Sequence, residues 1–134
     1  MLKKIILFSS QILTEQKAFA HCDIPCGIYD PHNAQLAAHT IIRMTELLGQ
    51  IKKEDELKAK HDVARVTHVK EKHADVLEEE LETLRNDYFK KEHFNEYKNL
   101  NDLFVNTLTA VGKTRQNIDL EAAEQVLAGT QEIA

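Results

Sequence analysis

The chain of 134 residues contains two cysteines, Cys22 and Cys26, in a short stretch with distinctive neighbours. His21 precedes the first cysteine, and Pro25 and Gly27 flank the second. A disulfide across three intervening residues would close a very small loop and would stabilise the fold little. The pair is therefore predicted to serve reactivity or metal ligation, with a plain thiol pair or a disulfide as the alternative.

Residues 1–20 differ in composition from the rest of the chain. Two lysines lead into a short apolar run, and Ala18-Phe19-Ala20 lies directly before His21. A small–x–small pattern resembles the cleavage region of an export signal, but the apolar run is too short to span a bilayer. The sequence predicts a removable leader at 1–20. Because this segment carries three lysines and one glutamate, its removal would change the net charge from −5 to −7.

Cleavage before His21 would create a new set of metal donors. The free α-amine, the Cys22 backbone nitrogen and the Cys22 and Cys26 thiolates can form a plane of two nitrogens and two sulfurs. The His21 imidazole can then bind from the axial direction. This donor set suits Ni(II) or Cu(II), whereas structural zinc prefers a closed tetrahedron. Zinc bound with the help of a further histidine is the alternative.

The rest of the chain reads as amphipathic helices. The spacing of apolar residues predicts helices over residues 31–48, 54–90, 95–111 and 118–128. Asp30-Pro31 is a helix-start signal, and glycines 49, 112 and 129 are expected to end three of the helices. The fold class is therefore all-α, an antiparallel four-helix bundle. We expect three parts: the leader at 1–20, a metal-binding hook at 21–30 and the bundle at 31–134.

Two polar residues, Lys70 and His73, lie on the apolar stripe of the second predicted helix. They are either partly solvated or have a role inside the bundle. This helix is also too long to be covered completely by its neighbours, so we expect self-association. The net charge of −5 is unlike that of a nucleic-acid binder, and neither a nucleic-acid nor a membrane partner is expected.

The stretch from His21 to Pro31 resembles the metal hook of the nickel superoxide dismutase family. It reads His-Cys-Asp-Ile-Pro-Cys-Gly-Ile-Tyr-Asp-Pro, and every position that defines the hook in the family is present. A second match lies at Asp87-Tyr88-Phe89-Lys90, followed by His93-Phe94. The resemblance extends over residues 21–128 and agrees with the predicted bundle.

The resemblance implies a role for each matching residue. The nickel ligands would be His21 through its amine and imidazole, Cys22 through its thiolate and backbone nitrogen, and Cys26 through its thiolate. Tyr29 and Tyr88 would order superoxide, peroxide or water beside the open face of the metal. Buried structural tyrosines are the alternative.

Other positions that the resemblance concerns lie around this centre. Lys90 would lie near the entrance, or would act only as a cation at a helix C-terminus. In the family a glutamate of the first helix and an arginine of the second orient the axial histidine. The corresponding positions here are Ala37 and His73, so His39, His73 or Glu71 are candidates for this role.

These observations predict a superoxide dismutase that converts superoxide to O₂ and H₂O₂ by Ni(II)/Ni(III) cycling. The resemblance also implies one nickel ion per chain, a homohexamer and a peptidase that removes the leader. The expected location is the cytoplasm, or outside it if the leader is a signal peptide. The alternatives are a nickel- or copper-binding bundle without enzymatic activity, such as a metallochaperone or storage protein, and a purely structural helical oligomer.

Overall fold

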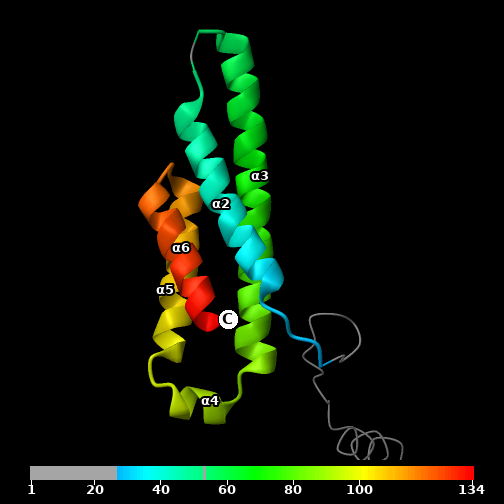
Figure 1. Cartoon of the computed structure of the whole chain (residues 1–134), viewed down its shortest axis with the longest axis vertical. Helices are drawn as coiled ribbons and strands as arrows, with labels where there is room; N and C mark the ends of the chain where they lie inside the picture. The colour runs from blue at the N-terminus through cyan, green and yellow to red at the C-terminus, as the bar shows by residue number, and fades with distance from the viewer. Residues whose placement is uncertain (1–26, 53) are drawn as a thin grey trace, which may run out of the picture.

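Four long helices form an antiparallel bundle in the computed structural model, which describes residues 27–52 and 54–134 (Figure 1). Helix α2 packs on α3 and α6, and α5 packs on α6 and α3. Their bounds are α2 His32–Gln50, α3 Glu56–Thr83, α5 Leu100–Gln116 and α6 Leu120–Ile133. The predicted fold class is confirmed. No helix in the described part of the chain is long and apolar enough to cross a membrane.

Helix α2 begins as the sequence predicts. The Asp30 carboxylate accepts a hydrogen bond from the His32 amide at 2.9 Å, and the Pro31 carbonyl accepts the amide of Gln35 at 3.0 Å. One apolar face of the helix packs into the core, and Ile42, Met44 and Leu47 at its border are partly buried. The buried residues of this helix are Ala34, Ala37, Ala38, Ile41, Thr45 and Leu48. The segment that precedes α2 is thereby held in a defined direction relative to the bundle.

Helix α3 is covered along only part of its length. Its N-terminus is capped by Asp55, whose carboxylate accepts the Lys58 amide at 3.0 Å. In this first part Leu57 is 81% exposed and Val63 is 44% exposed. The buried residues begin at Lys70, because the shorter α5–α6 pair lies only beside the C-terminal half of α3 (Figure 1).

The predicted ends of the helices are partly wrong. The second helix was expected to reach Lys90, but α3 ends at Thr83 and a π-helical turn, η1 (Leu84–Tyr88), follows it. The third expected helix is two elements, because a short helix α4 (Lys91–Glu96) precedes α5 and turns the chain back. The C-terminal end of α3, η1 and α4 together make the lower end of the bundle in Figure 1.

Glycine does not end α5 or α6, contrary to the prediction. Gly112 and Gly129 both lie inside their helices. An internal glycine costs only about 1 kcal/mol relative to alanine, which the packing of the following turn can offset. At Gly129 the close approach of α5 requires glycine, because an added Cβ would lie 2.1 Å from the Thr107 hydroxyl oxygen. Gly129 therefore allows α6 to approach α5 closely at this point.

Candidate metal centre and aromatic corner

The three expected nickel ligands, His21, Cys22 and Cys26, lie outside the described residues. The described chain begins at Gly27, whose φ of 67° is a left-handed conformation that residues with a side chain rarely adopt. The backbone at Gly27, directly after Cys26, thus adopts a conformation that is typical of tight turns.

The structure brings Tyr29 and Tyr88 together. Their ring centroids are 5.6 Å apart and the ring planes are inclined at 49°. Tyr29 lies just before α2 and packs partly against the core, while Tyr88 is the last residue of η1 and is 46% exposed. The second matching stretch of the sequence, which contains Tyr88, is thus in contact with the described segment just before α2.

The π-helical turn explains why the side chains of Tyr88 and Phe89 point in different directions. The Phe89 amide donates to the carbonyl of Leu84 at 2.9 Å, an i to i−5 bond that widens the last turn. Phe89 then adopts an extended conformation, and its ring contacts the buried Phe104 at 5.6 Å. Phe89 points into the core while Tyr88 stays at the surface. Single π-helical turns are frequent at functional sites.

Lys90 lies in the same corner. Its ammonium donates a hydrogen bond to the carbonyl of Asp87 at the end of η1, and its side chain is exposed. Its backbone amide donates to Nδ1 of His93 at 2.8 Å. The position of Lys90 next to Tyr88 agrees with a cation near the entrance to the expected metal centre. Its bond to the Asp87 carbonyl agrees equally well with a cation that stabilises the C-terminus of a helix.

His93 is a residue of this corner to which sequence reasoning gave no role. Its imidazole stacks on Tyr88 with a centroid distance of 6.0 Å and an angle of 8° between the planes. Its edge contacts Phe89 at 5.7 Å. We call Tyr29, Tyr88, Phe89, Lys90 and His93 the aromatic corner. The signal in the sequence was the His93-Phe94 pair in the second matching stretch.

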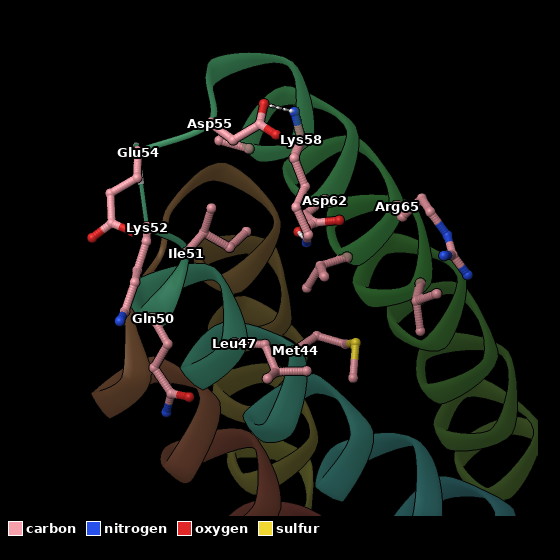
Figure 2. A pocket seen from close by; sticks show the side chains of 13 residues that line it. Met44, Leu47, Gln50, Ile51, Lys52, Glu54, Asp55, Lys58, Asp62 and Arg65 are labelled. Carbon is pink, nitrogen blue, oxygen red and sulfur yellow. Dashed lines mark hydrogen bonds and ion pairs between the residues drawn. The ribbon is translucent and has the colours of Figure 1, made fainter.

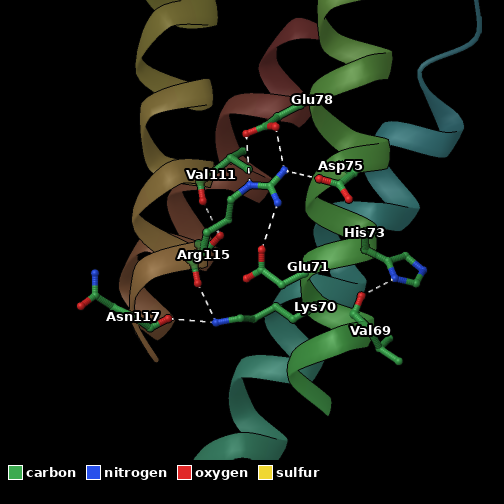
Figure 3. A network of polar contacts seen from close by, with 10 residues as sticks. Val69, Lys70, Glu71, His73, Asp75, Glu78, Val111, Arg115 and Asn117 are labelled. Atoms are coloured by element: carbon green, nitrogen blue, oxygen red, sulfur yellow. Dashed lines mark hydrogen bonds and ion pairs between the residues drawn. The ribbon is translucent and has the colours of Figure 1, made fainter. Parts of the chain in front are cut away.

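The candidates for orienting the axial histidine lie on different faces. Ala37 is 1% exposed and offers only a methyl group to the core. Nδ1 of His73 lies 2.8 Å from the carbonyl of Val69, and the Glu71 carboxylate accepts from Arg115 at 3.0 Å. Figure 3 shows His73 and Glu71 projecting from different sides of α3. Glu71 is therefore engaged toward α5, whereas His39 is exposed on α2.

Lys70 has a role inside the bundle. It is 3% exposed, and its ammonium donates to the carbonyls of Thr114 at 2.6 Å and Asn117 at 2.9 Å (Figure 3). Burial lowers the pKa of this ammonium, and the nearby charge of Glu71 acts in the opposite direction. Lys70 thus satisfies carbonyl groups at the C-terminal end of α5 that the helix itself leaves unpaired.

Arg115 joins the same two helices by three ion pairs. Its guanidinium donates to Glu78 and to Asp75 at 2.7 Å each, and to Glu71 at 3.0 Å. The hydrogen bonds that the guanidinium donates to Glu78 are the main cause that raises the pKa of Arg115, while burial opposes it. We call Lys70, Arg115 and their partners the polar seam. Its groups are engaged with one another, and it is distinct from the aromatic corner.

A groove lies at the other end of the bundle, between the end of α2 and the start of α3 (Figure 2). It has a volume of about 760 Å³ and an apolar floor that includes Met44, Leu47 and Val66. Charged residues such as Lys58 and Asp62 line its edge and pair with each other. Among residues 27–52 and 54–134, no group of three His, Cys, Asp or Glu side chains is arranged to hold a metal ion.

Comparison with known proteins decides the family. The family model of nickel-containing superoxide dismutase matches residues 16–134. The chain belongs to this family. The nickel superoxide dismutase of Streptomyces seoulensis is 32% identical over 111 residues, which are 83% of this chain and 80% of that protein. The corresponding enzyme of Streptomyces coelicolor is 32% identical over 108 residues, covering 81% of this chain and 78% of that protein.

A solved structure of a native nickel superoxide dismutase is similar in fold as well. It has a TM-score of 0.74 at 30% identity, and the match covers 84% of this chain and 92% of that one. Membership of this family confirms two predictions from the sequence, the superoxide dismutase class and the nickel cofactor. The assignment of individual ligands and site residues stays a prediction.

Proposed function

We propose that this chain converts two superoxide ions and two protons to O₂ and H₂O₂ with nickel held by an N-terminal hook. The ligands would be His21, Cys22 and Cys26, after cleavage between Ala20 and His21. The observation that carries the proposal is the contact of Tyr29 with Tyr88, at 5.6 Å between ring centroids. It brings the two matching stretches of the sequence to one place, in a chain of the nickel superoxide dismutase family.

The donor chemistry fits nickel. An amine, a backbone nitrogen and two thiolates form a set that suits Ni(II) in a tetragonal geometry. When bound, nickel supplies the one-electron oxidation and reduction, alternating between Ni(II) and Ni(III). The Cys22 and Cys26 thiolates would favour the higher oxidation state, and the imidazole of His21 would be a further ligand. Gly27, at a φ of 67°, lets the chain turn directly after the second thiolate.

The tyrosines would handle the substrate and its protons. A phenol hydroxyl can donate a hydrogen bond to an anionic oxygen and can also accept one. Tyr88 is 46% exposed, so that a small molecule from solvent can reach it, and it contacts Tyr29 on the hook side. Together these two residues would orient superoxide and peroxide through their hydroxyls and restrict access to small species.

Charge would guide the anion to this place. The mature chain would carry a net charge of −7, so its overall field repels superoxide. Lys90 places a positive charge on the exposed side of the aromatic corner. A local positive potential there would raise the encounter rate at low ionic strength.

Assembly completes the proposal. Residues 1–20 would be removed by a peptidase, since only cleavage before His21 creates the terminal amine that the hook requires. The uncovered N-terminal half of α3 would be buried between subunits of a homohexamer. We place the enzyme in the cytoplasm, with export as the alternative if the leader serves as a signal peptide.

The test begins with the N-terminus and the metal. We expect the intact mass of the active protein to correspond to a chain that starts at His21 and carries one nickel ion. Cys22→Ser and Cys26→Ser should each abolish nickel binding, because a thiolate ligand is lost. Glu124→Gln, a change of an exposed residue on α6, is the control and should retain nickel and activity.

Three results would contradict the proposal. Active protein that retains residues 1–20 would exclude a hook with a free amine at His21. Nickel binding without superoxide-dependent turnover would favour the nickel- or copper-binding bundle. A Cys22→Ser variant with unchanged nickel content and activity would leave only a structural role for the cysteine pair.

A further inference from the structure

Tyr88 is held in place although about half of its surface is exposed. An exposed tyrosine ordinarily gains little from packing and samples several rotamers. Here the ring has aromatic neighbours on several sides, Tyr29 at 5.6 Å, Phe89 at 5.0 Å and His93 at 6.0 Å. The ring of Phe89 is nearly perpendicular to that of Tyr88 and packs against the core. It therefore supports Tyr88 from the side of the core. The ring of His93 lies nearly parallel to that of Tyr88.

His93 is itself fixed by the backbone. Its Nδ1 lies 2.8 Å from the amide nitrogen of Lys90, at the start of α4. A backbone amide always donates, so Nδ1 must be the acceptor and the neutral ring carries its proton on Nε2. The Lys90 ammonium bonds to the Asp87 carbonyl and closes the same turn. The backbone of this turn thus determines the orientation of the imidazole.

The contact to Phe89 restricts the ring of His93 from a second direction. The two rings are nearly perpendicular, at 88°, with centroids 5.7 Å apart. The imidazole is therefore held at its Nδ1 by one bond and along its edge by a core aromatic. Its face lies parallel to Tyr88 within 8°. A side chain fixed in this way can hold a neighbouring exposed side chain in one position.

We propose that His93 is a positioning residue for Tyr88, holding the exposed phenol against Tyr29 through a ring contact that the Lys90 amide orients. The inference rests on the proposed function of Tyr29 and Tyr88, because it concerns how these two rings are held in contact. Among the described residues, His93 contacts the rings of Tyr88 and Phe89 and the backbone amide of Lys90. Its effect on turnover is exerted through the placement of the Tyr88 hydroxyl.

Two substitutions separate the ring of His93 from its acceptor atom. His93→Asn keeps an oxygen that can accept the Lys90 amide but removes the ring. His93→Phe keeps a ring that can stack on Tyr88 but removes the acceptor. If stacking positions Tyr88, the asparagine variant should be the more impaired of the two. His93→Gln is a second variant without a ring, for use if the asparagine variant does not fold.

The direct measurement is ¹⁹F NMR of protein labelled with 3-fluorotyrosine, recorded with and without nickel. The chain has three tyrosines, and Tyr88→Phe assigns the signal of Tyr88. We expect His93→Asn to shift and broaden this signal even in nickel-free protein, and His93→Phe to shift it less. Glu124→Gln, a change of an exposed residue on α6, should leave every signal in place.

The kinetic measurement follows on nickel-loaded protein. We expect kcat/KM of His93→Asn to fall roughly five- to tenfold at equal nickel content, because a small misplacement of a substrate-orienting group is costly. The loss should be smaller in His93→Phe. An unchanged Tyr88 signal and an unchanged kcat/KM in His93→Asn would overturn the inference. So would a lower Tm with the Tyr88 signal unmoved, since that is the result of a purely structural role.

These results are distinguishable from a failure of the proposed function. If the Tyr88 signal responds to His93→Asn but the unsubstituted protein does not consume superoxide, the proposed role of the pair fails and the structural dependence stands. If the protein turns over superoxide and neither the signal nor the rate responds to His93→Asn, only the inference about His93 fails.

Discussion

The aromatic corner and the polar seam both use residues that are unusual for their positions, but their relation to solvent is opposite. In the seam, Lys70 is buried and its ammonium has two carbonyl partners, while Arg115 has three carboxylates. No buried side-chain nitrogen or oxygen in the described part of the chain lacks a partner. In the corner, Tyr88 and Lys90 are exposed and are kept in place by neighbouring rings and short local bonds.

The difference separates two kinds of unusual residue. A buried charge that is bonded to groups of a neighbouring helix holds the two helices in register. An exposed ring in a fixed position contributes little to stability, so its order is more easily explained by a role toward solvent or substrate. We therefore expect changes in the seam to alter the free energy of unfolding. Changes in the corner should alter turnover.

The largest effect is expected where the corner meets the core. Phe104 is fully buried and its ring contacts Phe89. Phe104→Ala should reduce the free energy of unfolding by about 3–5 kcal/mol, the usual cost of removing a buried phenylalanine. Because Phe89 loses its support, the same change should also reduce activity in the fraction that stays folded. Chemical denaturation and an assay on folded protein measure the two effects.

Phe104→Leu is the matched control for this change. It keeps most of the apolar volume and should cost less than about 1.5 kcal/mol. The comparison between corner and core would be wrong if Phe104→Ala left the stability unchanged while activity was lost. In that case the corner would depend on Phe104 without the bundle depending on it.

The next largest effect is expected at the buried end of the seam. Lys70→Met leaves the carbonyls of Thr114 and Asn117 without their donor. The expected loss is about 1–3 kcal/mol of unfolding free energy, the cost of unsatisfied buried polar groups. Turnover per nickel ion should be unchanged, since this site is separate from the corner. Lys72→Met, a change of an exposed lysine on the same helix, should stay within about 0.5 kcal/mol.

The pH dependence gives an independent check on Lys70. Its pKa in the folded protein is lowered from 10.5, chiefly because burial disfavours the charged ammonium. Between the lowered pKa and 10.5 the unfolded chain therefore binds more protons than the folded one, and the contribution of this group to stability rises with pH. Below that window the contribution is constant. The unfolding free energy of the unsubstituted protein relative to Lys70→Met should thus increase as the pH approaches 10.5, and a decrease would contradict the assignment.

A smaller effect is expected at the outer part of the seam. Arg115→Met removes the shared cation of Glu71, Asp75 and Glu78, which are spaced along one face of α3. These carboxylates are partly solvated, so the expected loss is about 1 kcal/mol. Arg115→Lys should recover only part of it, because an ammonium cannot bind several carboxylates as a planar guanidinium does.

Salt decides whether this loss is electrostatic. With Arg115→Met the remaining carboxylates repel one another, and added salt screens that repulsion. The difference in unfolding free energy between the two proteins should therefore become smaller as NaCl increases. A difference that does not change with salt would mean that the aliphatic part of Arg115, and not its charge, joins α3 to α5.

The comparison also shows what the sequence could and could not predict. The bundle, the buried stripe of α2 and its start at Asp30-Pro31 follow from local spacing and capping, and they are confirmed. The ends of α5 and α6 do not follow, because glycine costs a helix little when the next turn is packed. Gly129 is needed because Thr107 of another helix lies close to it, and it does not end α6.

The candidate site divides in the same way. Tyr88 and Lys90 were predicted as site residues from a short matching stretch. The structure places Tyr88 in contact with Tyr29 and places Lys90 in the same corner. The role of His93 was missed because a stacked ring three or more residues away has no periodic signal in a sequence. Lys70 was left open for a related reason, since its partners are backbone carbonyls of a different helix.

The smallest effect is expected from the charge of Lys90, and it tests the corner most selectively. If Lys90 attracts superoxide, Lys90→Glu should lower kcat/KM by about two- to fivefold at low ionic strength and by less as salt screens the charge. Lys90→Met separates the loss of the bond to Asp87 from the reversal of charge. Lys91→Glu makes the same change of charge one residue further along, at an exposed position.

A salt dependence of Lys90→Glu equal to that of the unsubstituted protein would leave Lys90 with only its bond to the end of η1. An effect of Lys91→Glu as large as that of Lys90→Glu would show that the total charge of the surface, and not the position beside Tyr88, sets the rate.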